Sequence, residues 1–599
     1  MNEFFARLKQ RKLVQWGIAW VAFAFALLQG IDIVATRFDW PGAIERYLIL
    51  ALVIGFFVVL VLAWYHGEQG RQRVGGTELL IIALLLAIGG GLIWRFGVTA
   101  KTPGVTQAAT PAMPDMAHAG TRDAMPGPAM SIPEKSVAVL PFVNESGNKD
   151  EQFFSDGLSD DLITALSQFG GLKVISRNSA FQFRDSKDSS AAIGKRLGVA
   201  HLLEGSVQRA RDEVRITATL VNATDGTVLW SQRYDKPYRD LFKLQDDITH
   251  AVADALKAKL LTTPGAVVQS DRPPSGSLAA YNDFLQGKFY SERSSTESDL
   301  RKAIGYFTDA IHADPRYARA YAELAIAWGG LAGNYLDPVE AAQAWDKASE
   351  AVRAALSLDP DLAAAHSAHA FVLEAAYFDW MGAEAEDKHA VQLAPNDPAA
   401  KRGLAASLAT LGHPVQAIVL LRQAVAADPL CAECYVGMAH YLSSIGEFPE
   451  AWSAIHKAIQ LQPGKGWMTI WLAFIDTLRG NATAALQVAN GLPQGHWRDM
   501  MLAMVSQIGP DHATANAALQ TLIDKQAGTS AYQIAEIYAL RRDPDNTFVW
   551  LDRAWKNRDA GIAYLLTDPL VLRYKDDPRF AAFCKKVGLP TTTESKALP

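Results

Sequence analysis

Three closely spaced carboxylates, Asp156, Asp160 and Asp161, lie where a predicted strand, 136–142, runs through a polar loop into a predicted helix. Acidic side chains at such a turn can hold a divalent cation, polarise a water molecule or orient a nucleotide. On a helix, however, Asp160 and Asp161 point about 100° apart and do not converge on one small cation. Their spacing also lacks the alternating oxygens and distal glutamate of a calcium loop.

The alternative for these carboxylates is helix capping. Asp156 precedes Gly157 and the apolar-periodic run of the predicted helix 157–169, where a carboxylate can accept hydrogen bonds from first-turn amides. Further negative charge in that turn favours the helix dipole. The sequence contains no phosphate-binding GxxxxGK[ST] loop, HExxH or GxSxG motif. We therefore interpret the carboxylates as capping residues and expect no catalytic, cofactor or metal site; a nucleotide-sensing, metal-sensing or enzymatic domain is the alternative.

Two other groups of residues could react or bind a metal ion. Cys431 and Cys434 form a CxxC at the start of a predicted helix, which can lower a thiol pKa, but strand context, a following histidine and a second cysteine pair are all missing. We interpret them as adventitious. Segment 99–134 is rich in Pro, Ala, Gly, Met and Thr and is predicted to be a disordered linker. Its thioether and imidazole groups suit Cu(I), but we interpret them as the result of compositional drift: Met113, Met116, His118 and Met125.

Before this linker come three apolar segments, 13–35, 47–65 and 77–96, which predict transmembrane helices. Basic residues before the first segment predict a cytoplasmic N-terminus. Three spans would place the rest of the chain in the periplasm, so we expect a multi-pass protein of the bacterial inner membrane and envelope. The third segment is short; if it does not cross, the rest would be cytoplasmic.

Residues 135–262 predict an α/β domain. The elements follow the order β-α-β-α-β-β-β-α, which predicts a sheet covered on one side by helices. A helix at 189–197 is closed by Gly198, and "TDGT" predicts a hairpin turn. A final helix, 241–260, has one apolar face.

The blocks "LPF", "FSDGL", "LKVISR", "LEGSV", "VRITATL" and "LWSQRYD" follow one another across this domain. In that order they resemble the TolB-N-terminal-like domain of bacterial membrane regulators and tetratricopeptide-repeat (TPR) proteins. The resemblance implies a non-catalytic domain, placed after a transmembrane segment and before TPR units.

Residues 277–590 show a repeat period. Prolines close successive units, with later gaps of 34 or 35 residues: Pro315, Pro360, Pro395, Pro429 and Pro463. This is the period of a TPR helix pair. The first gap, of 45 residues, predicts a lengthened pair or loop near 329–338, and Asp387 stands where a large apolar residue is expected. The solenoid should end in degenerate repeats, with a linker at 263–276 and a disordered tail at 591–599.

First helices of TPR units line a concave face. Extending the period predicts a peptide groove lined by charged and aromatic residues: Arg319, Phe371, Glu374, Arg402, Glu433, His440, Trp467 and Phe474. Aromatic and charged side chains together suit an extended or helical peptide. Phe371 and Phe474 could instead be packing residues.

The predicted fold class is multidomain, with N-terminal transmembrane α-helices, a small α/β domain and an all-α TPR solenoid. A net charge of −6 gives no basic face for nucleic acid. We therefore expect a non-enzymatic, membrane-anchored scaffold or sensor that binds proteins or peptides through its groove. The sequence does not predict its oligomeric state.

Overall fold

The computed structural model describes residues 132–148, 151–210, 212–257, 259–260, 271–292, 296–463 and 465–598. The three predicted transmembrane segments and the copper-ligand candidates of the linker fall outside these residues. No helix in the described ranges is long and apolar enough to cross a membrane. The prediction of a transmembrane fold class, and with it of a multi-pass inner-membrane protein with a periplasmic C-terminal part, is corrected by this finding.

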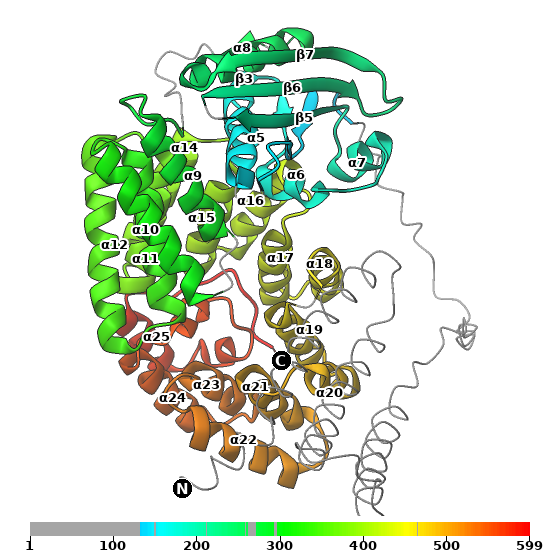
Figure 1. Ribbon diagram of the computed structural model, residues 1–599. Helices are drawn as coiled ribbons and strands as arrows, with labels where there is room; N and C mark the ends of the chain where they lie inside the picture. The colour runs from blue at the N-terminus through cyan, green and yellow to red at the C-terminus, as the bar shows by residue number, and fades with distance from the viewer. Residues whose placement is uncertain are drawn as a thin grey trace, which may run out of the picture. The chain divides into compact units, whose positions relative to one another are not determined.

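The described chain begins with a mixed sheet in the strand order β4-β1-β5-β6-β7, with β2 also paired to β5 (Figure 1). β1 runs parallel to β4 and β5, whereas β5, β6 and β7 form an antiparallel meander. Two short strands, β3 and β8, pair separately. The strand bounds are β1 Ser136–Val139, β2 Val143–Asn144, β3 Phe169–Gly170, β4 Lys173–Val174, β5 His201–Ala210, β6 Glu213–Asn222, β7 Val228–Pro237 and β8 Lys259–Leu260.

Helices cover both faces of this sheet, not one face as predicted. Alternation along the strands separates two cores: Val137 and Leu203 face α5 and α8, whereas Ala138 and Leu202 face α6 and α7. The second face is covered because the short helices between β4 and β5 fold back over it. The helix bounds are α5 Gln152–Leu166, α6 Arg177–Ala180, α7 Ser190–Leu197 and α8 Leu241–Ala255, with a 3₁₀ turn, η2, at Phe181–Phe183.

Local sequence signals explain several element ends. The Ser189 side chain accepts a hydrogen bond from the Ala192 amide at the start of α7, and Gly198 ends this helix at φ 64°. Gly226, at φ 71°, completes the predicted hairpin turn, in which the Asp225 carboxylate accepts from the Thr227 amide at 2.9 Å.

Helix α5 begins five residues before the predicted start. The prediction took Gly157 as a helix start, whereas this residue lies inside the helix and packs against another helix. A Cβ atom at Gly157 would lie 2.4 Å from both Cδ atoms of Leu285 on α9 (Leu278–Glu292), the first repeat helix. Glycine therefore lets two helix backbones approach closely in the middle of α5. The sequence offered the same glycine as a helix start.

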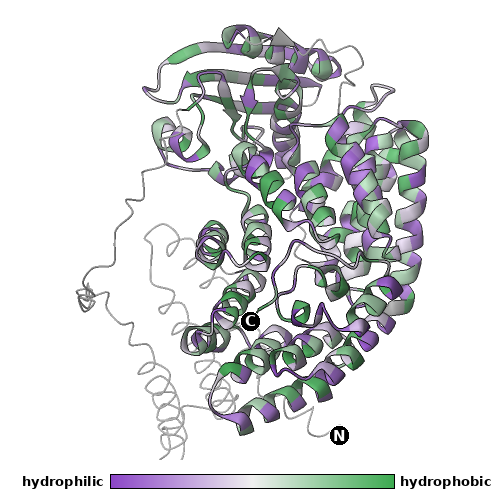
Figure 2. Cartoon of the chain, turned by 180° about the vertical axis from the view of Figure 1, so that it is seen from behind, coloured by the Kyte–Doolittle hydropathy of each residue, from purple (hydrophilic) through white to green (hydrophobic). Residues whose placement is uncertain are grey.

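After the α/β domain, the described part of the chain folds into eight successive helix pairs and a final helix α25 (Figure 1). Both hydrophilic and hydrophobic residues occur along these helices, as expected when one face of each is buried (Figure 2). The pairs are α9 Leu278–Glu292 and α10 Glu297–Ala313; α11 Ala318–Asn334 and α12 Pro338–Leu358; α13 Ala363–Val372 and α14 Trp380–Leu393; α15 Pro398–Thr410 and α16 Pro414–Ala427; α17 Ala432–Ser444 and α18 Phe448–Leu461; α19 Gly466–Leu478 and α20 Ala482–Gly491; α21 His496–Val505 and α22 His512–Gln526; α23 Ala531–Leu540 and α24 Pro544–Lys556; α25 is Pro578–Val587.

The helix pairs repeat with the TPR period, and their irregularities have local causes. The 45-residue gap contains α11 and α12, of 17 and 21 residues, which confirms a lengthened pair. In the next pair, a π-helical segment, η4 (Leu373–Tyr377), extends α13. Asp387 lies buried in α14 and accepts a hydrogen bond from Ser407 at 2.6 Å, and Gly403 leaves room for its carboxyl group. Burial raises the pKa of Asp387 to about 7.

Two segments predicted to be flexible make ordered contacts in the structure. Asp271, assigned to the linker 263–276, is buried beside α9 and α11. Residues 591–598, predicted to be a disordered tail, lie against the repeats, and the amide of Lys596 donates to the Ser444 carbonyl at 2.7 Å. The hydrophobic core is also continuous from the sheet to the first repeat, because it joins Leu203 and Leu158 to Phe284 and Phe307.

Replacing Gly157 with leucine should separate α5 from α9. We expect Gly157→Leu to lower the free energy of unfolding by about 2 kcal/mol or more, because overpacking outweighs the gain in helix propensity. Thermal unfolding of the full chain followed by circular dichroism measures the effect.

The matched control is Gly305→Leu in α10, where a Cβ atom would meet no heavy atom within 4 Å. This substitution should be neutral or stabilise by up to about 1 kcal/mol, the usual penalty for a helical glycine. Equal effects of the two substitutions would contradict the close approach of α5 and α9.

Candidate functional site: the repeat lining and the buried ion network

The carboxylates Asp156, Asp160 and Asp161 lie in the middle of α5 and do not cap it. The helix begins at Gln152, with Glu151 at the N-cap position. All three side chains are buried, and each has partners from another element. The interpretation as capping residues is therefore wrong, because the helix extends one and a half turns further towards the N-terminus than the glycine signal indicated.

Asp160 belongs to an ion network between the α/β domain and the first repeats. Lys288 on α9 places its Nζ atom 2.5 Å from the Asp160 carboxylate and 3.0 Å from that of Asp271. Asp271 lies 3.3 Å from the guanidinium of Arg319 on α11, which also pairs with Glu323 at 3.1 Å. Acid and base thus alternate from α5 through α9 to α11.

The other two carboxylates extend this contact. The Asp161 carboxylate accepts hydrogen bonds from the Tyr281 hydroxyl and from the Gln245 amide, the latter at 2.7 Å. Asp156 pairs with Arg184 at 2.7 Å. Arg177 of α6 lies 3.6 Å from the Asp160 carboxylate and also pairs with Glu292 at the end of α9.

The charge states follow from burial and from these partners. Burial alone would lower the pKa of Lys288, but Asp160 and Asp271 raise it above its ordinary value. Burial likewise opposes ionisation of Asp271, yet Lys288 and Arg319 hold its pKa at about 2. Burial, followed by the negative charge of Asp271, raises the pKa of Asp161 to about 7. The ammonium of Lys288 thus stays charged, and the neighbouring carboxylates balance its positive charge.

In this arrangement, protein groups already occupy the α5 carboxylates, so none of them faces solvent free to bind a ligand. Lys288 neutralises Asp160, α9 covers Asp161, and Arg184 occupies Asp156. Within the part of the chain that the structure describes, no group of three or more His, Cys, Asp or Glu side chains is arranged to hold a metal ion. The network acts as a structural joint.

A second contact joins the α/β domain to the fourth and fifth helix pairs. The Ser176 amide donates to the Ala427 carbonyl at 3.1 Å, and the Ser179 hydroxyl donates to the Asp428 carboxylate. The amide of Leu430 donates in turn to the Ser179 hydroxyl at 2.8 Å, and its side chain joins the core beneath α6 and α7. The α/β domain therefore contacts both the first repeats and the turn between α16 and α17.

Cys431 and Cys434 lie directly after this turn and form a disulfide at the start of α17. Both are buried. The interpretation as adventitious cysteines did not include this bond, since CxxC spacing alone does not reveal it.

The predicted groove residues have different surroundings, and four of them are engaged within the fold. Arg319 belongs to the ion network, and Phe371 packs against Trp345, with ring centroids 5.6 Å apart. His440 is buried, and burial lowers its pKa to about 3; its Nε2 atom lies 3.1 Å from the Thr567 hydroxyl. Phe474 lies in the C-terminal core. For Phe371 and Phe474, the packing alternative describes their surroundings.

Of the other four predicted groove residues, three are exposed and Glu374 is partly buried. Arg402 of α15 and Glu433 of α17 form an ion pair at 3.3 Å, and both side chains are about half exposed. Trp467 of α19 is 38% exposed. Glu374 lies in η4, and burial raises its pKa.

The C-terminal part of the chain contacts the first helices of these repeats. Tyr564 packs against His440 and Trp471, with ring centroids 5.0 and 6.0 Å away. Leu411 and Leu478, at the ends of α15 and α19, share a core with the segment around two 3₁₀ turns, η6 (Ala560–Tyr564) and η7 (Val571–Tyr574). In Figure 1 this C-terminal segment is red and lies between the green and yellow repeat helices. The sequence predicted a peptide-binding groove at positions where the chain's own C-terminal segment packs.

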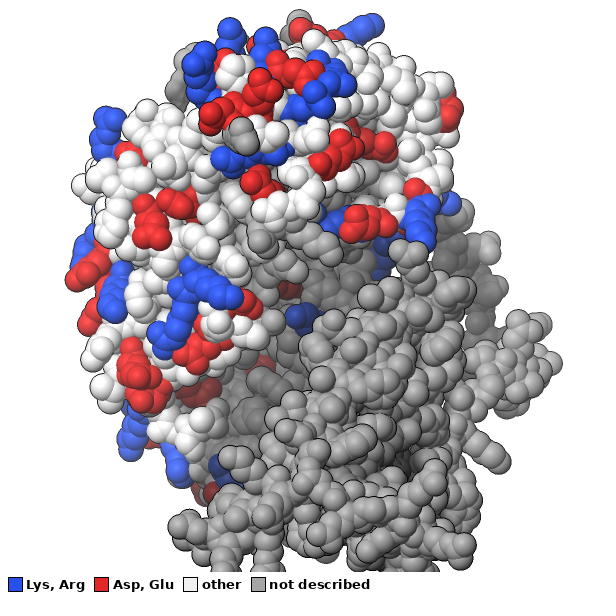
Figure 3. All heavy atoms as spheres, viewed as in Figure 1, with Lys and Arg blue, Asp and Glu red and all other residues white. Residues whose placement is uncertain are grey.

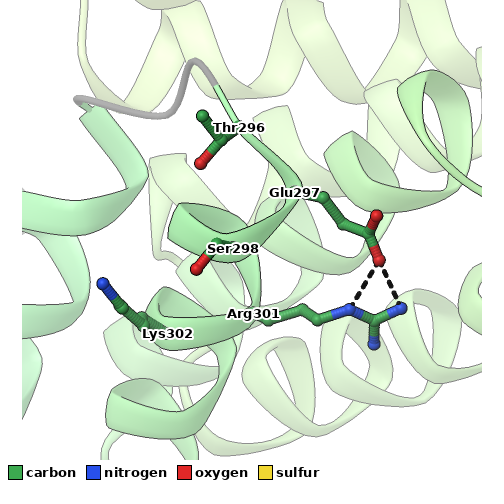
Figure 4. A pocket seen from close by; sticks show the side chains of 5 residues that line it. All are labelled: Thr296, Glu297, Ser298, Arg301 and Lys302. Atoms are coloured by element: carbon green, nitrogen blue, oxygen red, sulfur yellow. Dashed lines mark hydrogen bonds and ion pairs between the residues drawn. The ribbon is translucent and has the colours of Figure 1, made fainter. Parts of the chain in front are cut away.

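Two surface features carry no ligand chemistry. Figure 4 shows a shallow hollow at the start of α10, where Glu297 is already paired with Arg301. On the face seen in Figure 3, acidic and basic side chains are interspersed over the α/β domain and the repeats.

Sequence reasoning missed Lys288 and Asp271. One signal was available for Lys288, which falls at helical spacing on the apolar stripe of α9 formed by Tyr281, Phe284 and Leu285. A charged residue on a buried stripe requires a partner. Asp271 had no such signal, because it lies outside any periodic element.

Residues 133–270 match the family model described as the second domain of HilA/YgeH-like transcriptional regulators. The match covers the α/β domain, and the resemblance to a TolB-N-terminal-like domain is not confirmed. A chain from Rhizobium meliloti (strain 1021) named putative adenylate cyclase 3 is 35% identical over 200 residues. These residues are 33% of this chain and 34% of that one, so the chain spans about a third of the curated relative that it matches.

Solved structures with similar helices include PilW, a type IV pilus biogenesis factor, at 20% identity, covering 41% of this chain and 99% of that one with a TM-score of 0.30. YrrB, described as a TPR protein with an unusual peptide-binding site, is also 20% identical and covers 36% of this chain and 97% of that one, with a TM-score of 0.25. Similarities at this level carry no functional conclusion. The assignment of TPR-type repeats follows from the helix pairs and their period.

Removing the Lys288 charge should break the joint. We expect Lys288→Met to lower the stability of the full chain by about 3–5 kcal/mol, because two buried carboxylates lose their common partner. Thermal or denaturant unfolding measures the loss. Adding Asp160→Asn and Asp271→Asn should recover part of it.

The matched control is Lys525→Met, which removes an exposed pair with Asp499. Surface pairs contribute about 0–1 kcal/mol, so little change is expected. A Lys288→Met chain as stable as this control would rule out the network as a structural joint.

Proposed function

We propose that this chain is a scaffold that binds protein partners through the lining of its TPR-type repeats. The observation that carries the proposal is the placement of Arg402, Glu433 and Trp467. They lie on α15, α17 and α19, the first helices of three successive pairs, and all three keep exposed surface. Glu433 and Trp467 are 34 residues apart and so occupy equivalent positions in consecutive repeats.

The chemistry of this surface, which we call the exposed lining (Arg402, Glu433 and Trp467), suits a peptide ligand. Tryptophan and arginine dominate binding energy at protein interfaces. An ion pair that is half exposed can exchange its partner for a charged group on a ligand at small cost. An amphipathic or extended segment with one apolar anchor and a charge of either sign is the class of ligand that fits.

In this proposal the α/β domain is a non-catalytic module fixed to the repeats. The matched family is named for transcriptional regulators. The net charge of −6 over the whole chain nevertheless favours a protein partner over nucleic acid.

Site-specific photocrosslinking in cells tests the scaffold proposal. A benzoylphenylalanine at position 467 of the full chain should give discrete crosslinked partners. The same group at position 339 is the matched control, since Val339 on α12 is 71% exposed but lies outside the exposed lining. Against the purified partner, Trp467→Ala should weaken binding about tenfold or more, or roughly 1.4 kcal/mol. Identical crosslinks from both positions, or none from 467, would contradict the proposal.

A second candidate is catalysis or nucleotide sensing by the α/β domain. The observation that favours it is the 35% identity to a chain named putative adenylate cyclase 3. The sealed surroundings of Asp160 and Asp161 oppose it, since a ligand at either carboxylate would have to displace Lys288 or Tyr281.

Thermal-shift measurements on the full chain separate the two candidates. With ATP and Mg²⁺ or Mn²⁺ we expect no rise in Tm, because no carboxylate of α5 is free to bind the cation. A rise that Asp160→Asn abolishes, while the exposed-site control Asp235→Asn retains it, would establish the second candidate.

A further inference from the structure

The segment after α25 occupies the surface of the repeats like a bound peptide. Gly588 ends α25 at φ 76°, and Leu589 is buried in the C-terminal core. From there residues 592–598 cross the turns between α15 and α16 and between α17 and α18. We call residues 590–598 the tail segment and these two turns, around Gly412 and Gly446, the tail site.

Backbone hydrogen bonds hold the tail segment in an extended register. The amides of Glu594, Lys596 and Leu598, every second residue, donate to carbonyls of Gly412, Ser444 and Pro569 at 3.0, 2.7 and 2.8 Å. Alternate pairing of this kind is how extended peptides are recognised irrespective of their side chains.

Gly412 allows the segment to approach closely. Its φ is 86°, and a Cβ atom there would lie 3.0 Å from the Thr592 carbonyl oxygen and 3.1 Å from the side chain of Thr593. The Thr593 hydroxyl donates to the Leu566 carbonyl at 2.8 Å and lies 3.2 Å from the Gly412 carbonyl. A residue with a short hydroxyl side chain fits this position.

The next position is built for an acidic residue. Helix α16 has His413 at its N-cap, and this side chain does not cap the helix. The Glu594 carboxylate does so: it accepts from the Val415 amide at 3.3 Å and lies 3.5 Å from His413 Nδ1. A carboxylate at a helix N-terminus is also favoured by the helix dipole.

The fit of the tail segment is incomplete. The Ser595 side chain is 4% exposed, and its hydroxyl has no hydrogen-bond partner among the described residues. A buried hydroxyl without a partner weakens binding. Glu594 remains 38% exposed, and its hydrogen bonds are long. A peptide with the same pattern but a small apolar residue in place of Ser595 would bind more tightly than the tail segment.

We propose that the tail site binds an extended partner peptide and that the tail segment occupies it until displaced. The ligand carries, in order, a hydroxyl residue, an acidic residue and a small residue, with an apolar residue three positions later, as in Thr593, Glu594, Ser595 and Leu598. This assignment rests on the proposed scaffold function, since it adds a partner sequence and an intramolecular competitor to the same repeats.

Fluorescence anisotropy on the full chain tests the proposal. The probe is a labelled synthetic peptide, Pro-Thr-Thr-Thr-Glu-Ala-Lys-Ala-Leu, which is the tail segment with Ser595→Ala. The wild-type chain should bind it weakly, because its own segment competes. Glu594→Ala in the chain loosens that segment and should tighten probe binding at least tenfold, whereas Ser595→Ala in the chain should weaken it. A probe that also has glutamine at the Glu594 position should bind at least tenfold more weakly.

A variant of the site keeps the test independent of folding. In His413→Asp, the new side chain can cap α16 itself and repels an acidic ligand. Combined with Glu594→Ala, it should abolish probe binding without lowering Tm. Probe binding that is equal in all variants, or absent even from the Glu594→Ala chain, overturns the proposal.

Two further outcomes are decisive. If the Glu594→Ala chain does not bind the probe but position 467 still crosslinks to partners, the tail site is refuted and the scaffold function is retained. Concentration-dependent self-association of the wild-type chain that Glu594→Ala abolishes, measured by sedimentation, would mean that the segment binds a second copy, which also overturns the intramolecular assignment.

Discussion

The arrangement of the described domains depends on the ion pairs that Lys288 forms with Asp160 and Asp271. A buried ammonium is unfavourable unless carboxylates surround it, and here they come from two elements, α5 and the segment before α9. Because Asp271 also pairs with Arg319, a series of alternating charges links the α/β domain, the first repeat helix and the second repeat. The close approach at Gly157 supplies the apolar part of the same contact. These carboxylates resemble an active site in sequence, but they serve as a joint in the structure.

The second contact, at Ala427 to Leu430, gives this joint a consequence for binding. The α/β domain touches the repeats at two places that are separated by several helix pairs, and it thereby restrains the curvature of the helices between them. Solenoid repeats otherwise contact only their neighbours and bend as a chain of similar units. A restrained lining presents the exposed residues and the turns at Gly412 and Gly446 in a fixed relation, which lowers the entropic cost of ordering the repeats when a peptide binds.

Period predicted more of this fold than individual residues did. The proline spacing located the helix pairs, and α7 was predicted with its C-terminal cap because Gly198 is a local signal. The start of α5 was misjudged because glycine serves both helix ends and close helix contacts, and the sequence does not show which helix will lie opposite. The same reason explains why some groove residues were misjudged. His440 and Phe474 fall at lining positions, but the period carries no information about the C-terminal segment that packs on them.

We place function on the exposed lining and on the tail site, and the tail segment occupies the tail site. Hydrogen–deuterium exchange of the full chain tests this claim most directly, because backbone amides that donate to protein carbonyls exchange slowly. The amides of residues 594–598 should exchange more slowly than those of a free peptide of the same sequence, and they should lose this protection when a partner peptide is added. Exchange as fast as in the free peptide, with no change on peptide binding, would contradict the account.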